Sequence, residues 1–296
     1  MENTFERELS REQYNKTPRV VLHLFRHGQA ERDPNKSNQA FELSDAGRQQ
    51  ALGKSKLISD NYNLDQSVAF GSPRIRAQQT AGFAMAGETV DAITGDESLD
   101  ELKQKIDEGI KVGSKIGVDP RLDFYLDKNT PFGREAYEAV FITQDYMRFL
   151  VNRSDKLAIE TGDQKASTYS RQASDVAKIV NKYIQVGERW NQLVESGAYE
   201  DPKLERFLGS HGGVVESFLL KVVERVKGVL ERDKLLMLMP HQFDYTEGID
   251  VTLVGHGPEQ TIHIVFRKID PQNPDRNFEF NEDVPREIIE EIMANR

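Results

Sequence analysis

The chain has 296 residues, of which 38% are hydrophobic, and it carries a formal net charge of −10 at pH 7 and no cysteine. This length can bury the core of one large α/β domain or two smaller ones, whereas the acidic balance argues against a nucleic-acid surface. The lack of cysteine excludes disulfides, thiolate metal sites and thiol nucleophiles, and no apolar run approaches a membrane span or a signal sequence, so we expect a cytoplasmic protein with no membrane or nucleic-acid partner.

An apolar, β-branched run at 20–25 predicts a strand that is buried on both faces, as in the middle of a parallel sheet. It follows a polar tail, residues 1–17, and ends at Arg26-His27-Gly28, where the glycine lets the chain turn. Ligands of open α/β sheets bind at the carboxyl ends of the strands. A guanidinium there can bind two phosphate oxygens, and a neutral imidazole can attack phosphorus. Taken alone, the motif is better explained by a strand-end histidine bonded to a backbone carbonyl.

A second strand end carries residues of the same kind. This is the short strand expected at 67–70, which ends at Ser72. Before it, a helix is expected to begin at Ser44, a good N-cap. The next helix has Arg76 in its first turn. Free amides and the macrodipole at a helix N-terminus favour anions, so Ser72 and Arg76 are candidate phosphate neighbours. A single arginine at such a place is more often a surface residue.

Residues 103–165 differ from the rest of the chain, because glycines interrupt them and one amphipathic helix, at 137–150, lies inside. We expect this segment to be an insertion on the sheet rather than an independent domain, since its apolar content is thin for a core. A strand is expected before it at 89–93, and a long amphipathic helix after it at 170–195.

A third strand end lies at 207–213, where His211 and two glycines precede a helix that begins at Val214. Segments 249–254 and 261–266 alternate between apolar and polar residues and predict a hairpin. Three separate strand ends therefore each bring a cationic or histidine group.

Five motifs of the chain occur in an order that resembles the histidine phosphatase superfamily, also called phosphoglycerate-mutase-like. The resemblance covers about half of the chain, residues 20–102 and 166–230. The matching residues are Arg26-His27-Gly28; Leu43-Ser44, Gly47 and Gln50-Ala51; Ser72-Pro73, Arg76-Ala77 and Gln79-Thr80-Ala81; Leu99 and Glu101; and His211-Gly212-Gly213.

The resemblance implies a division of roles among these residues. His27 would be the nucleophile that is transiently phosphorylated, and Glu101 would give a proton to the leaving oxygen and later take one from water. The phosphoryl oxygens would be held by Arg26, Arg76 and His211, and we place Gly28 and Ser72 in the same phosphate site. Of the adjacent carboxylates Asp100 and Glu101 only one can face the phosphate, and the match selects Glu101.

Physical chemistry is consistent with these roles. Two nearby arginines would lower the pKa of His27 and keep it neutral, and a phosphate dianion would raise the pKa of Glu101. Phosphoryl transfer depends mostly on positioning and charge neutralisation, which guanidiniums and an imidazole can supply. We therefore expect no metal and no cofactor.

The remaining histidines carry weaker patterns. His23 lies inside a strand and is expected to be a satisfied core group, while His256 lies in the hairpin turn and is expected to be a solvated loop residue outside the site. His241 and His263 fit no motif, and the spacing of the histidines and carboxylates does not indicate a metal site.

The fold that these elements and the resemblance predict is a three-layer α/β/α sandwich with a mainly parallel sheet. It would span 18–270, with 103–165 as a mostly helical cap and 271–296 as a C-terminal extension that ends in a helix at 287–293.

Two departures leave the substrate open. The residues after Gly28 differ from those of the cofactor-dependent mutases, and the residues after Glu101 lack the family's usual pattern. We expect a phosphomonoesterase that acts through phosphohistidine on a small-molecule phosphate ester or a phosphoprotein. A protein phosphohistidine phosphatase, a phosphosugar mutase and a catalytically silent phospho-ligand-binding module are the alternatives, and the oligomeric state is open.

Overall fold

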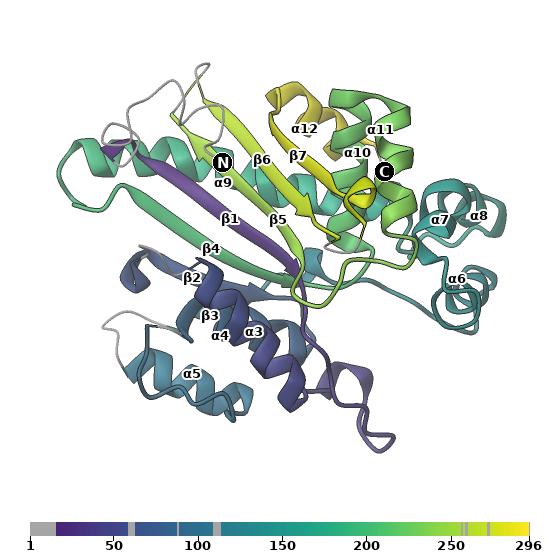
Figure 1. Cartoon of the computed structure of the whole chain (residues 1–296), viewed down its shortest axis with the longest axis horizontal. Helices are drawn as coiled ribbons and strands as arrows, with labels where there is room; N and C mark the ends of the chain where they lie inside the picture. Colours follow the sequence, from purple (N-terminus) through teal and green to yellow (C-terminus); the bar gives the residue numbers. More distant parts are fainter. Residues whose placement is uncertain are drawn as a thin grey trace.

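A seven-stranded mixed sheet organises the molecule, with strand order β3-β2-β4-β1-β5-β6-β7 (Figure 1). The computed structural model describes residues 16–58, 63–87, 89–108, 114–255, 257, 260–270 and 273–295. The strands are β1 (Arg19–Arg26), β2 (Ser67–Gly71), β3 (Ile116–Val118), β4 (Lys203–Ser210), β5 (Gly248–Val254), β6 (Thr261–Lys268) and β7 (Phe278–Asp283).

The sheet is parallel from β3 through β2 and β4 to β1, and antiparallel from β1 through β5 and β6 to β7. The expected hairpin is β5 with β6, in which Val254 pairs with Thr261. The parallel strands fall where the sequence has helices between strands, because a parallel pair needs a long crossover connection.

Helices cover both faces of the sheet, and side-chain alternation along the strands divides the core between them. Val20, Leu22 and Leu24 of β1 pack in the larger core with α9, α10 and α12. Phe25, on the opposite face, packs in the smaller core with α3, α4 and α5. The expected α/β/α sandwich is therefore confirmed.

The helices gather in three groups, and α6, α7 and α8 lie on the side toward which β1 and β4 run (Figure 1). We call these three helices the cap. The α-helices are α3 (Asp45–Ile58), α4 (Ile75–Ala86), α5 (Leu99–Glu108), α6 (Pro131–Phe141), α7 (Tyr146–Phe149), α8 (Asp155–Thr161), α9 (Tyr169–Glu195), α10 (Val214–Lys227), α11 (Val229–Leu238) and α12 (Arg286–Ala294), and a π-helical turn (Leu150–Ser154) joins α7 to α8. In the described part of the chain, no helix has both the length and the apolar run that a membrane crossing requires.

The expected strand at 89–93 is wrong, because these residues form turns. The buried Glu97 carboxylate accepts hydrogen bonds from the backbone N–H groups of Thr94 at 2.8 Å and Gly95 at 2.9 Å, which bends the chain instead of extending it. Asp91 and Ala92 are exposed, so the alternation that suggested a half-buried strand does not correspond to a sheet face.

Two segments that the sequence suggested as an insertion and an extension contribute strands and helices to the sheet and its helical layers. Residues 103–165 contain most of α5, which packs on α4, and also β3, so the cap helices begin only at Pro131. The segment 271–296 supplies β7 to the sheet and α12 to the helical layer on α9. Most of the tail at 1–17 lies outside the described residues.

Candidate active site

The register of the sheet aligns the three predicted strand ends. Arg26 at the end of β1 lies opposite Ser210 of β4, and Gly71 at the end of β2 lies opposite Gly209 of the same strand. The residues that follow therefore leave one edge of the sheet side by side, at the carboxyl ends of the strands where α/β proteins bind ligands. These residues are His27, Ser72 and His211.

One ring nitrogen of His27 is fixed by the backbone. Nδ1 lies 2.6 Å from the carbonyl oxygen of Gly28, which can only accept, so Nδ1 carries the proton and Nε2 keeps its lone pair. The Nε–H of Arg76 donates to that Nε2 at 3.2 Å. Burial, together with the guanidiniums of Arg76 and then Arg26, holds the pKa of His27 well below its ordinary value. The ring is thus neutral and presents a nucleophilic nitrogen beside a cation.

The hydrogen-bonding groups of Gly28 are both used within the protein, and its carbonyl orients His27. Its N–H already donates to Thr80 Oγ1 at 3.1 Å, so the expectation that Gly28 binds phosphate is not supported. A Cβ at this position would lie 2.6 Å from the carbonyl oxygen of Gly47 on α3, so the glycine is required by the close approach of two backbones.

Ser72 and His211 form a buried pair. Ser72 Oγ lies 2.7 Å from His211 Nε2 and accepts the backbone N–H of Arg74 at 3.2 Å, so the serine positions the histidine. Nδ1 of His211 is buried and has no hydrogen-bond partner among the described residues. Burial, followed by the charges of His27 and Arg76, holds the pKa of His211 well below its ordinary value. A buried imidazole nitrogen without a partner is costly unless a ligand satisfies it.

The two predicted arginines flank His27. Arg26 donates through Nη1 to the carbonyl of Phe243, and its Nε is buried without a partner among the described residues. Arg76 is only 5% exposed, and its Nη1 donates to Asn38 O at 2.7 Å. Burial and then the neighbouring charge of Arg74 lower the pKa of Arg76 to about 10. It therefore remains a cation at neutral pH, held close to other cations.

Arg74 is a third arginine of the site, which the sequence analysis missed. It is the N-cap residue of α4, is 8% exposed, and stacks on Phe124 with 4.2 Å from the guanidinium carbon to the ring centroid. The sequence contained a signal for this residue, because Arg74 stands two positions before Arg76 at the same strand-to-helix junction. Three guanidiniums and two neutral imidazoles make a small positive site in an acidic protein, which suits an anion.

Glu101, the general acid that the sequence suggested, is engaged by its own helix. It sits in the first turn of α5 with an exposed side chain, and its Oε2 accepts the backbone N–H and the hydroxyl of Ser98, both at 2.8 Å. These two hydrogen bonds lower the pKa of Glu101, whereas a general acid needs a raised one. Glu101 therefore caps its own helix, as an acidic residue in a first turn does.

Asp123 is the carboxylate that the structure brings to the histidines. Its Oδ1 accepts from Arg74 Nε at 2.6 Å and lies 3.4 Å from His211 Nε2. It follows β3, and the hydroxyl of Ser210 donates to the carbonyl of Leu122 at 2.8 Å, which ties this segment to the end of β4. A fourth strand end thus contributes to the site, and the signal for it was the short apolar stretch 116–118 before Pro120.

The other histidines lie in different surroundings. His23 is buried between Asp250 at 2.7 Å and Glu205 at 3.4 Å, as expected of a satisfied core group. His263 is buried and bonded to Asp283 and Asn281, each at 2.7 Å. His241 is exposed. The hairpin residue His256 lies outside the described residues, so its expected place away from the site is untested.

No cluster of three or more histidine and acidic side chains with the arrangement of a metal site occurs among the residues that the structure describes. The site is built from arginine, histidine and one carboxylate, a donor set that holds an oxyanion by hydrogen bonds and charge.

Fold and site together define an α/β protein with three arginines beside a neutral histidine at the carboxyl edge of its sheet, a donor set that suits an anion. Residues 22–139 match the family model of the histidine phosphatase superfamily (branch 1). Over this segment the chain is similar to the histidine phosphatase superfamily, and the similarity supports hydrolysis or transfer of phosphoesters in general.

The solved structures that resemble the chain do so at low identity. A mycobacterial glucosyl-3-phosphoglycerate phosphatase is 17% identical, with 81% of this chain and 91% of that one covered and a TM-score of 0.41. A structure described as mycobacterial hydrolase 2 is 15% identical, with 94% and 97% covered and a TM-score of 0.42. A phosphoglycerate mutase from Bacillus anthracis is 13% identical, with 94% and 99% covered and a TM-score of 0.44. No curated protein matches the chain.

Proposed function

We propose that the protein is a phosphomonoesterase that hydrolyses a phosphate ester through a phosphohistidine intermediate on His27. The observation that carries this proposal is the orientation of His27, whose Nδ1 is fixed by Gly28 O at 2.6 Å while Nε2 lies 3.2 Å from Arg76 Nε. A neutral, unprotonated nitrogen beside a guanidinium is what attack on a phosphoryl group requires, and the hydrogen bond from Arg76 must pass from Nε2 to the phosphoryl oxygens as the substrate binds.

Phosphate binding in this proposal satisfies the groups that lack partners. The phosphoryl oxygens accept hydrogen bonds from Arg26, Arg76 and His211, which include a buried guanidinium nitrogen and a buried imidazole nitrogen without partners among the described residues. Guanidiniums pair with phosphate oxygens through parallel N–H groups, so binding removes the cost of leaving these atoms unsatisfied.

The reaction then proceeds in two displacements. His27 Nε2 forms a bond to phosphorus as the ester P–O bond breaks, and Asp123, which we propose in place of Glu101 as the general acid, gives its proton to the leaving oxygen. Water then attacks phosphorus, its proton goes to Asp123, the P–N bond breaks, and inorganic phosphate leaves with His27 restored.

The substrate in this proposal is a small-molecule phosphate ester or a phosphoprotein. Rapid-quench experiments with ester labelled in the phosphoryl group should place the label on His27, in a form that is labile to acid and stable to base. His27→Ala is the control and should carry no label.

Label on another residue, or turnover without any labelled protein, would contradict this mechanism. Transfer of the label to a second hydroxyl of the substrate rather than to water would identify a mutase. Binding of the ester with neither label nor turnover would identify a silent binding module.

A further inference from the structure

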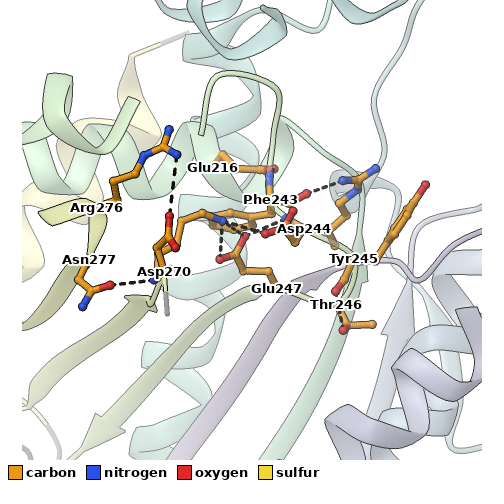
Figure 2. Close-up of polar contacts among 11 residues, drawn as sticks. Glu216, Phe243, Asp244, Tyr245, Thr246, Glu247, Asp270, Arg276 and Asn277 are labelled. Atoms are coloured by element: carbon orange, nitrogen blue, oxygen red, sulfur yellow. Dashed lines mark hydrogen bonds and ion pairs between the residues drawn. The ribbon is translucent and has the colours of Figure 1, made fainter. Parts of the chain in front are cut away.

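The loop 240–247, which leads into β5, lies beside the candidate active site and is fixed to it at several points (Figure 2). The backbone N–H of Phe243 donates to the buried carboxylate of Glu216 at 2.7 Å, and the carbonyl of Phe243 accepts Nη1 of Arg26. Arg26 also exchanges backbone hydrogen bonds with the loop, to Thr246 at 3.1 Å and Glu247 at 2.9 Å. The loop is therefore held in register with the strand that carries the nucleophile.

Lys268 fixes the loop from its other side. This lysine of β6 places Nζ 3.0 Å from Asp244 Oδ2 and 2.9 Å from Glu247 Oε2, so that it bridges the two carboxylates that flank Tyr245 and Thr246 in sequence. Lys268 and Glu247 are only 19% and 16% exposed, so their contact is less screened by solvent than a surface ion pair, whereas the Asp244 carboxylate is 85% exposed. Tyr245 and Thr246, the two residues between these carboxylates, are thus tied to β6 on both sides.

Tyr245 is the residue of the loop 240–247 whose side chain lies beside the site. The guanidinium carbon of Arg26 lies 4.3 Å from the centroid of the tyrosine ring, and the ring centroid of His27 lies 6.3 Å away. The side chain remains 39% exposed, and Figure 2 shows the ring extending away from the loop backbone with its hydroxyl at the outer end. No step of the phosphoryl transfer uses this ring, so its place beside the nucleophile needs another explanation.

We propose that Tyr245 is a specificity-determining residue whose exposed ring surface contacts the leaving group of the ester, and that Lys268 is a positioning residue that holds it there. The inference rests on the proposed function and extends it to the substrate class. An aromatic ring surface favours a leaving group with a flat C–H face, such as a hexose ring, over a short acyclic one, because it adds contact area at low entropic cost. The preferred substrate is then a cyclic, sugar-like phosphate ester.

Equilibrium affinity tests this proposal without relying on turnover. In a His27→Ala background, glucose 6-phosphate, glycerol 3-phosphate and inorganic phosphate are titrated calorimetrically into the parent, Tyr245→Phe and Tyr245→Leu proteins. The parent should bind the hexose ester more tightly than the glycerol ester. Tyr245→Leu should reduce that preference roughly 3- to 10-fold, the loss typical of a stacked aromatic contact, whereas Tyr245→Phe, which keeps the ring, should retain it.

Inorganic phosphate separates two roles of the ring. If Tyr245 only orients Arg26, Tyr245→Leu weakens the binding of inorganic phosphate and of both esters by the same factor. That result overturns the proposal. Equal affinity of the parent for the two esters overturns it as well. If the proposal holds, inorganic phosphate binding changes less than hexose phosphate binding.

Lys268→Met tests the positioning role. Lys227→Met is the matched control, because Lys227 makes an ion pair of its own, with Glu282 of β7 at 2.5 Å, and not with the loop 240–247. Lys268→Met should lower the hexose preference in the same direction as Tyr245→Leu, and Lys227→Met should leave it unchanged. A hexose preference that survives Lys268→Met overturns the positioning role. Failure of the wild-type protein to form phosphohistidine would instead count against the proposed function, so the two failures are distinguishable.

Discussion

At His27, a single backbone contact decides which ring nitrogen can react. The Gly28 carbonyl engages Nδ1, and the guanidinium of Arg76 faces Nε2. The arginine that keeps the ring neutral is thus also placed to receive the phosphoryl oxygens, so one residue serves both the protonation state of the nucleophile and the charge of the transferred group. Burial is the main reason that the pKa of His27 is lowered, and the guanidinium of Arg76 lowers it further.

The choice between Asp123 and Glu101 gives a prediction at the residue scale. If Asp123 protonates the leaving oxygen, Asp123→Asn should lower kcat for an alkyl phosphate by roughly 10²-fold or more, because an alkoxide leaves poorly without a proton. The same variant should lower phosphoenzyme formation from nitrophenyl phosphate much less, because nitrophenolate needs little help. Single-turnover kinetics on both esters measures the difference.

Glu101→Gln is the control for this experiment. Its carboxylate is exposed and engaged with Ser98 at 2.8 Å, so the variant should be close to wild type on both esters. If Glu101→Gln shows the leaving-group dependence and Asp123→Asn does not, the assignment from the sequence is right and the one from the structure is wrong.

The sequence predicts the residues whose motifs are local, and it misses those whose place depends on distant pairing. His27, Arg76 and His211 each stand at a strand end that is visible in a short stretch of sequence. Asp123 reaches the site only because β3 pairs with β2, Gly71 opposite Val118, and no local pattern specifies that pairing. Glu101 was selected by a motif match, while the helix that begins at Leu99 uses it as a cap.

At the scale of elements, a contact between the cap and the loop after β1 bears on the site. The guanidinium carbon of Arg32, in the loop after β1, lies 5.8 Å from the ring centroid of Phe141 at the end of α6. The charge of Arg32 is also among those that lower the pKa of Arg76, after burial and Arg74. The loop therefore connects the cap helix to the arginines of the site, which favours a role for α6 in substrate choice.

This contact predicts that Phe141→Ala raises KM for a bulky natural ester by about 3- to 10-fold, because an aromatic and cation–π surface beside the substrate is lost. The value of kcat for nitrophenyl phosphate should stay near that of the wild type, since the cap contributes no reacting group. Ile142→Ala is the matched control, as Ile142 is the adjacent residue and is 70% exposed. Equal effects of both substitutions, or a loss of kcat on the aryl ester, would contradict this role for α6.

Some helices and strands can be recognised from their own sequence, whereas others are defined only by the strand with which they pair. Helices α9 (Tyr169–Glu195) and α12 (Arg286–Ala294) and the β5–β6 hairpin follow from periodicity and turn residues, and all three were predicted. The edge strands β3 and β7 were not, because an edge strand is short or polar and is defined by its neighbour rather than by its own pattern.

At the scale of the whole molecule, the two cores meet at a sheet that carries buried charge. His23 of β1 lies between Asp250 of β5 at 2.7 Å and Glu205 of β4 at 3.4 Å, so one ion cluster crosses three strands. Burial lowers the pKa of His23, but Asp250 and then Glu205 outweigh burial and raise it above its ordinary value. Burial likewise opposes ionisation of Asp250, but His23 lowers its pKa to about 2. The cluster is therefore charged across the acidic and near-neutral range.

The cluster predicts how stability depends on pH. A group whose pKa is raised in the folded state stabilises it fully below the unfolded pKa, about 6.5 for histidine, and loses that contribution as pH rises through the folded pKa. The lowered pKa of Asp250 acts in the opposite sense, and its contribution is lost only as pH falls below about 4 toward 2. Urea unfolding at pH 5.5 and pH 9 should therefore show that His23 stabilises the protein more at the lower pH, by about 1.4 kcal/mol for each unit by which its pKa is raised.

The comparison that isolates this contribution is the difference between wild type and His23→Gln at each pH, since groups outside the cluster titrate equally in both proteins. That difference in the free energy of unfolding should shrink from pH 5.5 to pH 9, because the histidine is neutral at the higher pH and has lost its charged interaction with Asp250 and Glu205. His241→Gln is the control, and it should change the free energy of unfolding little because the side chain is exposed. A difference for His23→Gln that grows with pH would mean that the buried imidazole is neutral in the folded protein, and that Asp250 and Glu205 do not outweigh its burial.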